Sequence, residues 1–153
     1  MDIDKLKKFE KLPPDVKRQL ALYMSKWNDK KKQSTIKQDF MAFVKHVWPD
    51  FIEGSHHKQV AKKFNDIANG KTKRVIINMA PRHTKSEFAS YLLPAWMVGR
   101  NPKLKIIQST NTTELSVRFG RKAKALMDTP EYKEIFETRL KEDSQAAGKW
   151  ETQ

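Results

Sequence analysis

The sequence contains no cysteine, only five glycines in 153 residues, and no long apolar run. The lack of thiols excludes a disulfide framework and any metal site built on thiolates. No stretch approaches the length that crosses a membrane, and the charged residues 1–8 lack the apolar centre of a signal peptide. These absences favour a protein of the cell interior that makes no membrane contact.

Positive charge, in contrast, is abundant. Lysine and arginine number 31 against 18 acidic residues, which gives a formal net charge of +13. Such a balance favours contact with a polyanion such as DNA or a nucleotide, and the alternative is charge that serves solubility alone. One predicted helix carries a cluster of four cations, which either contacts DNA or a neighbouring subunit or is merely a solvated face: Arg118, Arg121, Lys122 and Lys124.

Helical periodicity dominates the N-terminal part of the chain. A short charged helix is predicted over residues 4–12, and a second helix begins at Pro14 with apolar residues every three or four positions. Residues 28–33 are polar and are predicted to be a linker. We therefore expect two parts, an N-terminal helical segment with its linker over residues 1–33 and a second domain over residues 34–153.

Within the second domain, further helices are predicted near residues 35–47, 55–69 and 111–129. The caps expected for them are Thr35, Ser55 and Asn111. Pro94 is expected to end or kink a helix over residues 87–98, and the polar tail after Thr138 is expected to fray.

The most informative segment is residues 74–86. The β-branched run at residues 75–77 predicts a buried strand, which leads through a short loop to Lys85 and Ser86 at the start of a helix. Residues 105–109 are predicted to form a second strand. Strand, loop, Lys-Ser and helix follow one another as in a P-loop, where backbone N–H groups bind phosphates, the lysine neutralises them and the hydroxyl ligates Mg²⁺.

Two positions depart from the P-loop pattern. Met79 and Thr84 stand where the pattern has glycine, which such loops use because of their unusual backbone angles. The alternative interpretation is an ordinary strand, turn and helix with an exposed basic turn.

Residues 80–86, Ala-Pro-Arg-His-Thr-Lys-Ser, resemble the P-loop variant of tailed-phage terminase large subunits, in which Pro-Arg-x-x-Lys-Ser replaces the glycine-rich form. The resemblance to the ATPase domain of that family extends over most of residues 36–150. It includes residues 43–51, 56–59, 94–96, 99–102, 105–110, 115, 118, 132–136 and 149–150. It implies an α/β fold: N-terminal helices followed by the start of a P-loop NTPase parallel sheet, as in an incomplete RecA-like (ASCE) domain.

The resemblance also implies a function and a set of site residues. The family hydrolyses ATP with Mg²⁺ to move double-stranded DNA into procapsids in the host cytoplasm, as a homo-oligomeric ring with a portal protein and a small terminase subunit. The nucleotide would be bound by Ala80, Pro81, Arg82, His83, Thr84, Lys85 and Ser86. Catalytic roles would fall to Lys85 and Arg82, and Ser86 would ligate Mg²⁺. Gln59 is a candidate reader of the adenine edge, although a solvated helix residue is the alternative.

Other features of the family are missing from the sequence. No apolar strand ends in the Asp and Glu of a Walker B motif, and no cluster of nuclease carboxylates follows. We therefore expect the N-terminal part of a longer protein, or a truncated gene product, that does not turn over ATP by itself. Two alternatives are a fragment of another P-loop DNA motor, such as a helicase, and a non-enzymatic basic DNA-binding or assembly fragment. A metal site at His56 and His57 is not predicted, because adjacent helical residues point about 100° apart.

Overall fold

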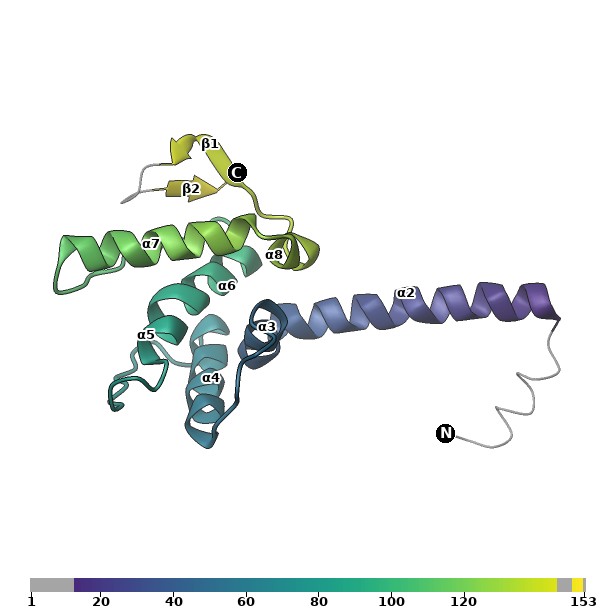
Figure 1. Ribbon diagram of the computed structural model, residues 1–153, viewed down its shortest axis with the longest axis horizontal. Coiled ribbons are helices and arrows are strands. Elements are labelled where there is room, and N and C mark those ends of the chain that lie inside the picture. Colours follow the sequence, from purple (N-terminus) through teal and green to yellow (C-terminus); the bar gives the residue numbers. More distant parts are fainter. Residues whose placement is uncertain (1–12, 146–149, 153) are drawn as a thin grey trace. The chain divides into compact units, whose positions relative to one another are not determined.

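The computed structural model describes residues 13–145 and 150–152 (Figure 1). The chain divides into two compact units, residues 1–35 and 36–153. Helix α2(Pro14–Gln38) forms the described part of the first unit and ends in the second. Residues 28–33, expected to be a linker, are helical. The apolar stripe of α2 is not buried, since the side chains of Met24 and Trp27 are more than half exposed.

The second unit is built mainly from short helices. They are α3(Phe40–Val47), α4(Ser55–Ala68), α5(Lys85–Glu87), α6(Leu93–Arg100), α7(Thr113–Asp128) and α8(Pro130–Ile135). Helix α3 contacts α4, α6 and α8, and α7 contacts α6 and α8. The start of α3 is set by Asp39, whose carboxylate accepts the Ala42 N–H at 2.7 Å, rather than by Thr35. The expected stop before Pro49 is confirmed.

Phe40 lies at the centre of the core. Its ring makes edge-to-face contacts with Phe64, Phe88 and Trp96 at centroid distances of 5.2–5.5 Å, and its side chain is fully buried. Such aromatic pairs stabilise beyond their buried area by about 0.5–1.5 kcal/mol each. The three partners come from α4, from the turn after α5 and from α6, so one side chain of α3 packs against all three segments.

Helices α5 and α6 are joined without a break by a π-helical turn, Phe88–Leu92. Pro94 follows this turn, has no N–H to donate, and in a regular α-helix would clash with the carbonyl four residues before it. The wider turn accommodates it, with the Leu93 N–H bonded to the Phe88 carbonyl. The helical run therefore continues to Arg100. Of the two expected effects of Pro94, an end to the helix does not occur, and the helix instead departs from regular α geometry in the turn before it.

The prediction of an α/β fold with the start of a parallel P-loop sheet is wrong. Residues 74–80 and 104–110 adopt no regular secondary structure and pair with no strand in the described part of the chain. Its one sheet is instead an antiparallel pair, β1(Leu140–Gln145) and β2(Trp150–Thr152), in the region expected to fray. Ile76, predicted to lie in a buried strand, is 89% exposed, and Ile107 of the second predicted strand is 97% exposed. β-Branched side chains suit a pleated, half-buried surface only where neighbouring strands provide one. Here the buried core consists of side chains from the helices and the residues next to them.

Two helix starts also differ from expectation by one residue. Helix α7 is capped by Thr112, whose hydroxyl accepts the Leu115 N–H at 3.3 Å, rather than by Asn111. Helix α4 is capped by Gly54 rather than by Ser55. No helix among the described residues is both long enough and apolar enough to cross a bilayer.

Candidate nucleotide-phosphate loop

The loop over residues 79–86 has an unusual backbone. Arg82 and Thr84 adopt positive φ angles of 64° and 57°, and they are the only non-glycine residues to do so in the described chain. For residues with a Cβ this left-handed conformation costs about 1–2 kcal/mol. Thr84 occupies the position where the P-loop pattern has glycine, so threonine here adopts the backbone angle that glycine would otherwise supply.

The loop ends at the start of the helical run that begins with α5. Thr84 caps this run, and its carbonyl accepts the first helical hydrogen bond, from the Phe88 N–H at 2.9 Å. The backbone N–H groups of residues 85–87 have no acceptor among the described residues. Left-handed and right-handed residues in succession turn their N–H groups into a concave anion site, and a helix N-terminus adds partial positive charge.

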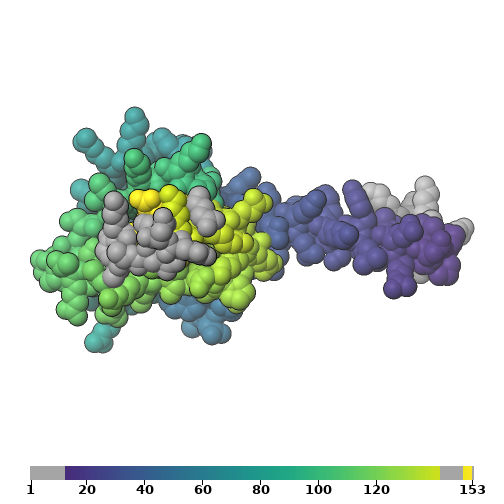
Figure 2. All heavy atoms as spheres, turned by 90° about the horizontal axis from the view of Figure 1, so that it is seen from above, coloured from purple at the N-terminus to yellow at the C-terminus, as the bar shows by residue number. Residues whose placement is uncertain are grey.

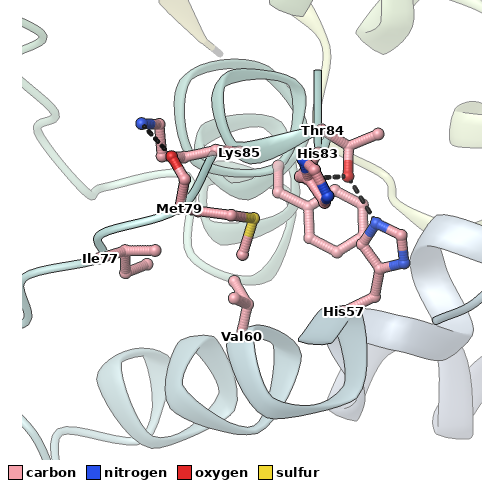
Figure 3. Close-up of a pocket in the computed structure, with 8 residues that line it drawn as sticks. His57, Val60, Ile77, Met79, His83, Thr84 and Lys85 are labelled. Atoms are coloured by element: carbon pink, nitrogen blue, oxygen red, sulfur yellow. Dashed lines mark hydrogen bonds between the residues drawn. The ribbon is translucent and has the colours of Figure 1, made fainter. Parts of the chain in front are cut away.

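Lys85 and Ser86 lie at this helix start with exposed side chains. The Lys85 ammonium group donates to the Met79 carbonyl at 3.2 Å, which folds the side chain back along the loop (Figure 3). Because this bond is single and exposed, the ammonium group can exchange it for a phosphate oxygen at little cost. The exposed Arg82 side chain adds a second cation to the same loop.

Below the loop lies a small cavity of about 10 Å³, room for roughly one water molecule. Its walls are His57, Val60, Ile77, Met79, His83, Thr84, Lys85 and Phe88. This space is too small for an adenine ring, so any nucleotide would lie on the open side of the loop. Gln59, the predicted adenine reader, is exposed on α4 and does not line the cavity.

His57 contacts the loop, and the sequence did not predict this contact. It is 7% exposed, and its Nε2 lies 2.7 Å from the Thr84 hydroxyl (Figure 3). Its Nδ1 accepts the Gly54 N–H at 2.9 Å, which closes the first turn of α4. Burial lowers the pKa of this imidazole, the neighbouring His56 and then His83 lower it further, and Glu53 opposes them. The neutral imidazole is therefore favoured near neutral pH.

Glu87 connects the loop to α7. Its carboxylate accepts two hydrogen bonds from Lys122 at 2.7 and 2.9 Å, and the same ammonium group lies 5.5 Å from the Tyr91 ring. Lys122 was predicted to belong to a basic DNA-contacting face, but the structure gives it this partner. Arg118 and Arg121 of that predicted face are exposed.

Three histidines lie near the loop but do not form a metal site. His56 lies 3.8 Å from His57 and 5.5 Å from His83, measured between ring centroids. No group of three His, Cys, Asp or Glu side chains in the described parts of the chain converges as metal ligands would. The Ser86 hydroxyl can serve a Mg²⁺ that arrives with a nucleotide, because Mg²⁺ takes most of its ligands from phosphates and water in such sites.

Comparison with known proteins adds no family to this picture. The chain matches no protein-family model, no curated protein and no solved structure.

Proposed function

We propose that residues 79–86 bind the phosphates of ATP with Mg²⁺, and that the chain is the nucleotide-binding part of a terminase-like DNA-packaging ATPase. The observation that carries the proposal is the left-handed Thr84 directly before Lys85. It leaves the N–H groups of the first helical turn without acceptors among the described residues, beside a lysine and a hydroxyl. The resemblance of residues 80–86 to the terminase loop supplies the choice of nucleotide and motor.

Each loop residue has a role that its position supports. Lys85 would neutralise the β- and γ-phosphates, and Ser86 would ligate the Mg²⁺ that ATP brings. Arg82 would add charge toward the γ-phosphate. The remaining members, Ala80, Pro81, His83 and Thr84, would contribute backbone and shape. Gln59 stays a prediction for the adenine edge, from its place on α4 beside His57 and Val60.

A titration with a fluorescent ATP analogue in the presence of Mg²⁺ tests this proposal. A charge-assisted hydrogen bond to phosphate contributes about 1.5–3 kcal/mol, so Lys85→Ala should weaken binding about 10- to 100-fold. The control is Lys133→Ala, which removes an equal charge from α8, where Lys133 pairs with Asp128. Equal affinity of wild type and Lys85→Ala would reject the loop as the phosphate site.

A second candidate function is non-specific DNA binding, which the net charge of +13 favours. It is compatible with the first, since a packaging motor must hold its DNA. Helix α7, green in Figure 2, lies at the surface of its unit and carries the exposed Arg118 and Arg121. If the loop failed to bind nucleotide while DNA binding persisted, a basic DNA-binding or assembly protein would be the better description.

A further inference from the structure

A directed series of hydrogen bonds joins the N-terminus of α4 to the loop. The Gly54 N–H can only donate, so the Nδ1 atom of His57 that it contacts at 2.9 Å carries no proton. In the neutral ring the proton therefore lies on Nε2, which donates to the Thr84 hydroxyl at 2.7 Å. The hydroxyl in turn donates to the His83 carbonyl at 2.7 Å. Each donor thus meets one acceptor along the whole series.

This series occupies a hydroxyl that would otherwise act elsewhere. A threonine at a helix N-cap ordinarily accepts a hydrogen bond from the N–H two or three residues later. Thr84 is the N-cap of α5 and makes no such bond. Its backbone is left-handed rather than extended, and its oxygen contacts His57 instead, so the N–H groups of Ser86 and Glu87 are not covered by their own cap.

We infer that His57 is a positioning residue for phosphate binding. It holds Thr84 in the left-handed conformation and keeps the Thr84 hydroxyl away from the first turn of the helix, where phosphate oxygens would bind. His57 itself touches no phosphate in this account, and the inference rests on the proposed function of the loop. Without this hydrogen bond Thr84 would return to the extended backbone of an ordinary N-cap, and its hydroxyl would then compete with the nucleotide for the same N–H groups.

Substitutions at His57 can separate its two hydrogen bonds. In His57→Asn, the side-chain oxygen can replace Nδ1 as acceptor for the Gly54 N–H, but the chain is too short to reach Thr84. In His57→Gln, the amide nitrogen reaches the place of Nε2 and can donate to the Thr84 hydroxyl. Thr84→Val removes the hydroxyl and keeps the branched shape. His56→Asn is the matched control, because the Nε2 of His56 has no hydrogen-bond partner among the described residues.

The experiment measures the affinity for the fluorescent ATP analogue with Mg²⁺, under conditions where circular dichroism finds every variant folded. We expect His57→Asn to weaken binding about tenfold, a loss equivalent to one hydrogen bond. His57→Gln should stay within about threefold of wild type, and His56→Asn within about twofold. On the Thr84→Val background, His57→Asn should change affinity less than about twofold, because the Thr84 hydroxyl through which His57 acts is then absent.

The outcomes separate this inference from the function it rests on. If Lys85→Ala binds as tightly as wild type, the loop is not the phosphate site, whatever the histidine variants do. If Lys85→Ala loses binding while His57→Asn retains it, the proposed function stands and the positioning role is wrong. An equal loss from His57→Asn with and without the Thr84 hydroxyl would also overturn the role, since His57 would then act by another route.

The tautomer gives a test that needs no nucleotide. In ¹⁵N-edited spectra of the imidazole above pH 7, His57 should carry its proton on Nε2, with Nδ1 unprotonated. A proton on Nδ1 would contradict the hydrogen-bond series and with it the inference.

Discussion

Thr84 combines a branched side chain with a left-handed backbone, two properties that oppose each other. Strained conformations of this kind persist where surrounding contacts hold them, and they concentrate at ligand sites. The His57 hydrogen bond is such a contact. Arg82 shares the positive φ, but its side chain is exposed. Fewer side-chain contacts therefore compensate for the backbone strain at Arg82 than at Thr84.

Arg82→Asn should therefore stabilise the protein. Asparagine tolerates the left-handed region, so the substitution should raise the free energy of unfolding by about 0.5–1 kcal/mol. Urea unfolding followed by circular dichroism measures it. In the control, Arg121→Asn, the same change in a helix should lower stability by a few tenths of a kcal/mol. A loss of stability at Arg82 would mean that its side chain makes a contact worth more than the strain.

The pKa of His57 predicts how stability depends on pH. Because burial lowers this pKa in the folded state, the unfolded chain binds a proton more readily. The contribution of His57 to stability is thus fully present above the unfolded pKa of about 6.5 and is lost as the pH falls through the lower folded value. The titratable groups that act on the ring are Glu53, His56 and His83.

We expect wild type to lose more stability than His57→Gln between pH 7.5 and pH 5.5, because glutamine does not titrate. Urea unfolding at the two pH values measures this difference. An NMR titration of the wild type should place the His57 pKa below that of a histidine in a denatured peptide. A pKa at or above 6.5 would contradict the assignment of a buried, neutral ring.

At the scale of the elements, close approach of helices depends on single small residues. The end of α6 lies against α8 at Gly99, where an added Cβ would come within 2.6 Å of the Tyr132 hydroxyl oxygen and 2.7 Å of the Phe136 ring. Both aromatic side chains are buried. Tyr132 is further held by its hydrogen bond to the Ala95 carbonyl at 2.9 Å, so it cannot move aside easily.

Gly99→Ala should consequently destabilise the protein by about 1–3 kcal/mol, the usual cost of overpacking a core. The direction of this stability change is informative, because alanine normally stabilises a helix relative to glycine by about 0.5–1 kcal/mol. The control is Gly70→Asn, at a left-handed helix end (φ 72°) with open space around the missing Cβ, which should change stability by less than about 0.5 kcal/mol. Thermal or urea unfolding of the two variants compares them. A stable Gly99→Ala would mean that α8 can shift away from α6.

On the scale of the whole molecule, charge is the property that acts at a distance. The excess of 13 positive charges is spread through a sequence in which acidic residues are interspersed, so only some of the cations can face one partner. Other cations already pair with acidic side chains, as Lys122 does with Glu87 and Lys45 with Glu53, and are less available to neutralise DNA phosphates. A handful of phosphate contacts is therefore the reasonable expectation for DNA.

Duplex DNA binding should weaken steeply with salt. Each neutralised phosphate contributes about −0.9 to the slope of log affinity against log salt. The double variant Arg118→Gln/Arg121→Gln should reduce the slope by roughly 2 if both residues of α7 contact phosphate. Fluorescence anisotropy from low to physiological salt measures both values.

The matched control is Lys62→Gln/Lys63→Gln, which removes two exposed cations from α4. If this pair lowers the slope and the α7 pair does not, the DNA lies against α4 instead. An affinity that does not depend on salt would contradict the electrostatic account as a whole.

The sequence alone determined most helix positions and the chemistry of the loop. Within the predicted helices the apolar residues recur at helical spacing, which is a local property of the chain, and the structure buries Phe40, Phe43, Phe64 and Phe119 of that pattern. The order of Lys85 and Ser86 after the short loop likewise needed no tertiary information. Helix ends were predicted less well, since a neighbouring Thr, Asp or Gly can serve as cap and local sequence does not choose among them.

The tertiary structure alone decided the rest. Whether residues 75–77 form a strand depends on a partner strand elsewhere in the chain, which local propensity cannot supply. The capture of the Thr84 hydroxyl by His57, and of Lys122 by Glu87, joins residues 27 and 35 positions apart. Such contacts arise only when packed helices bring these side chains within about 3 Å, and no local pattern encodes that distance.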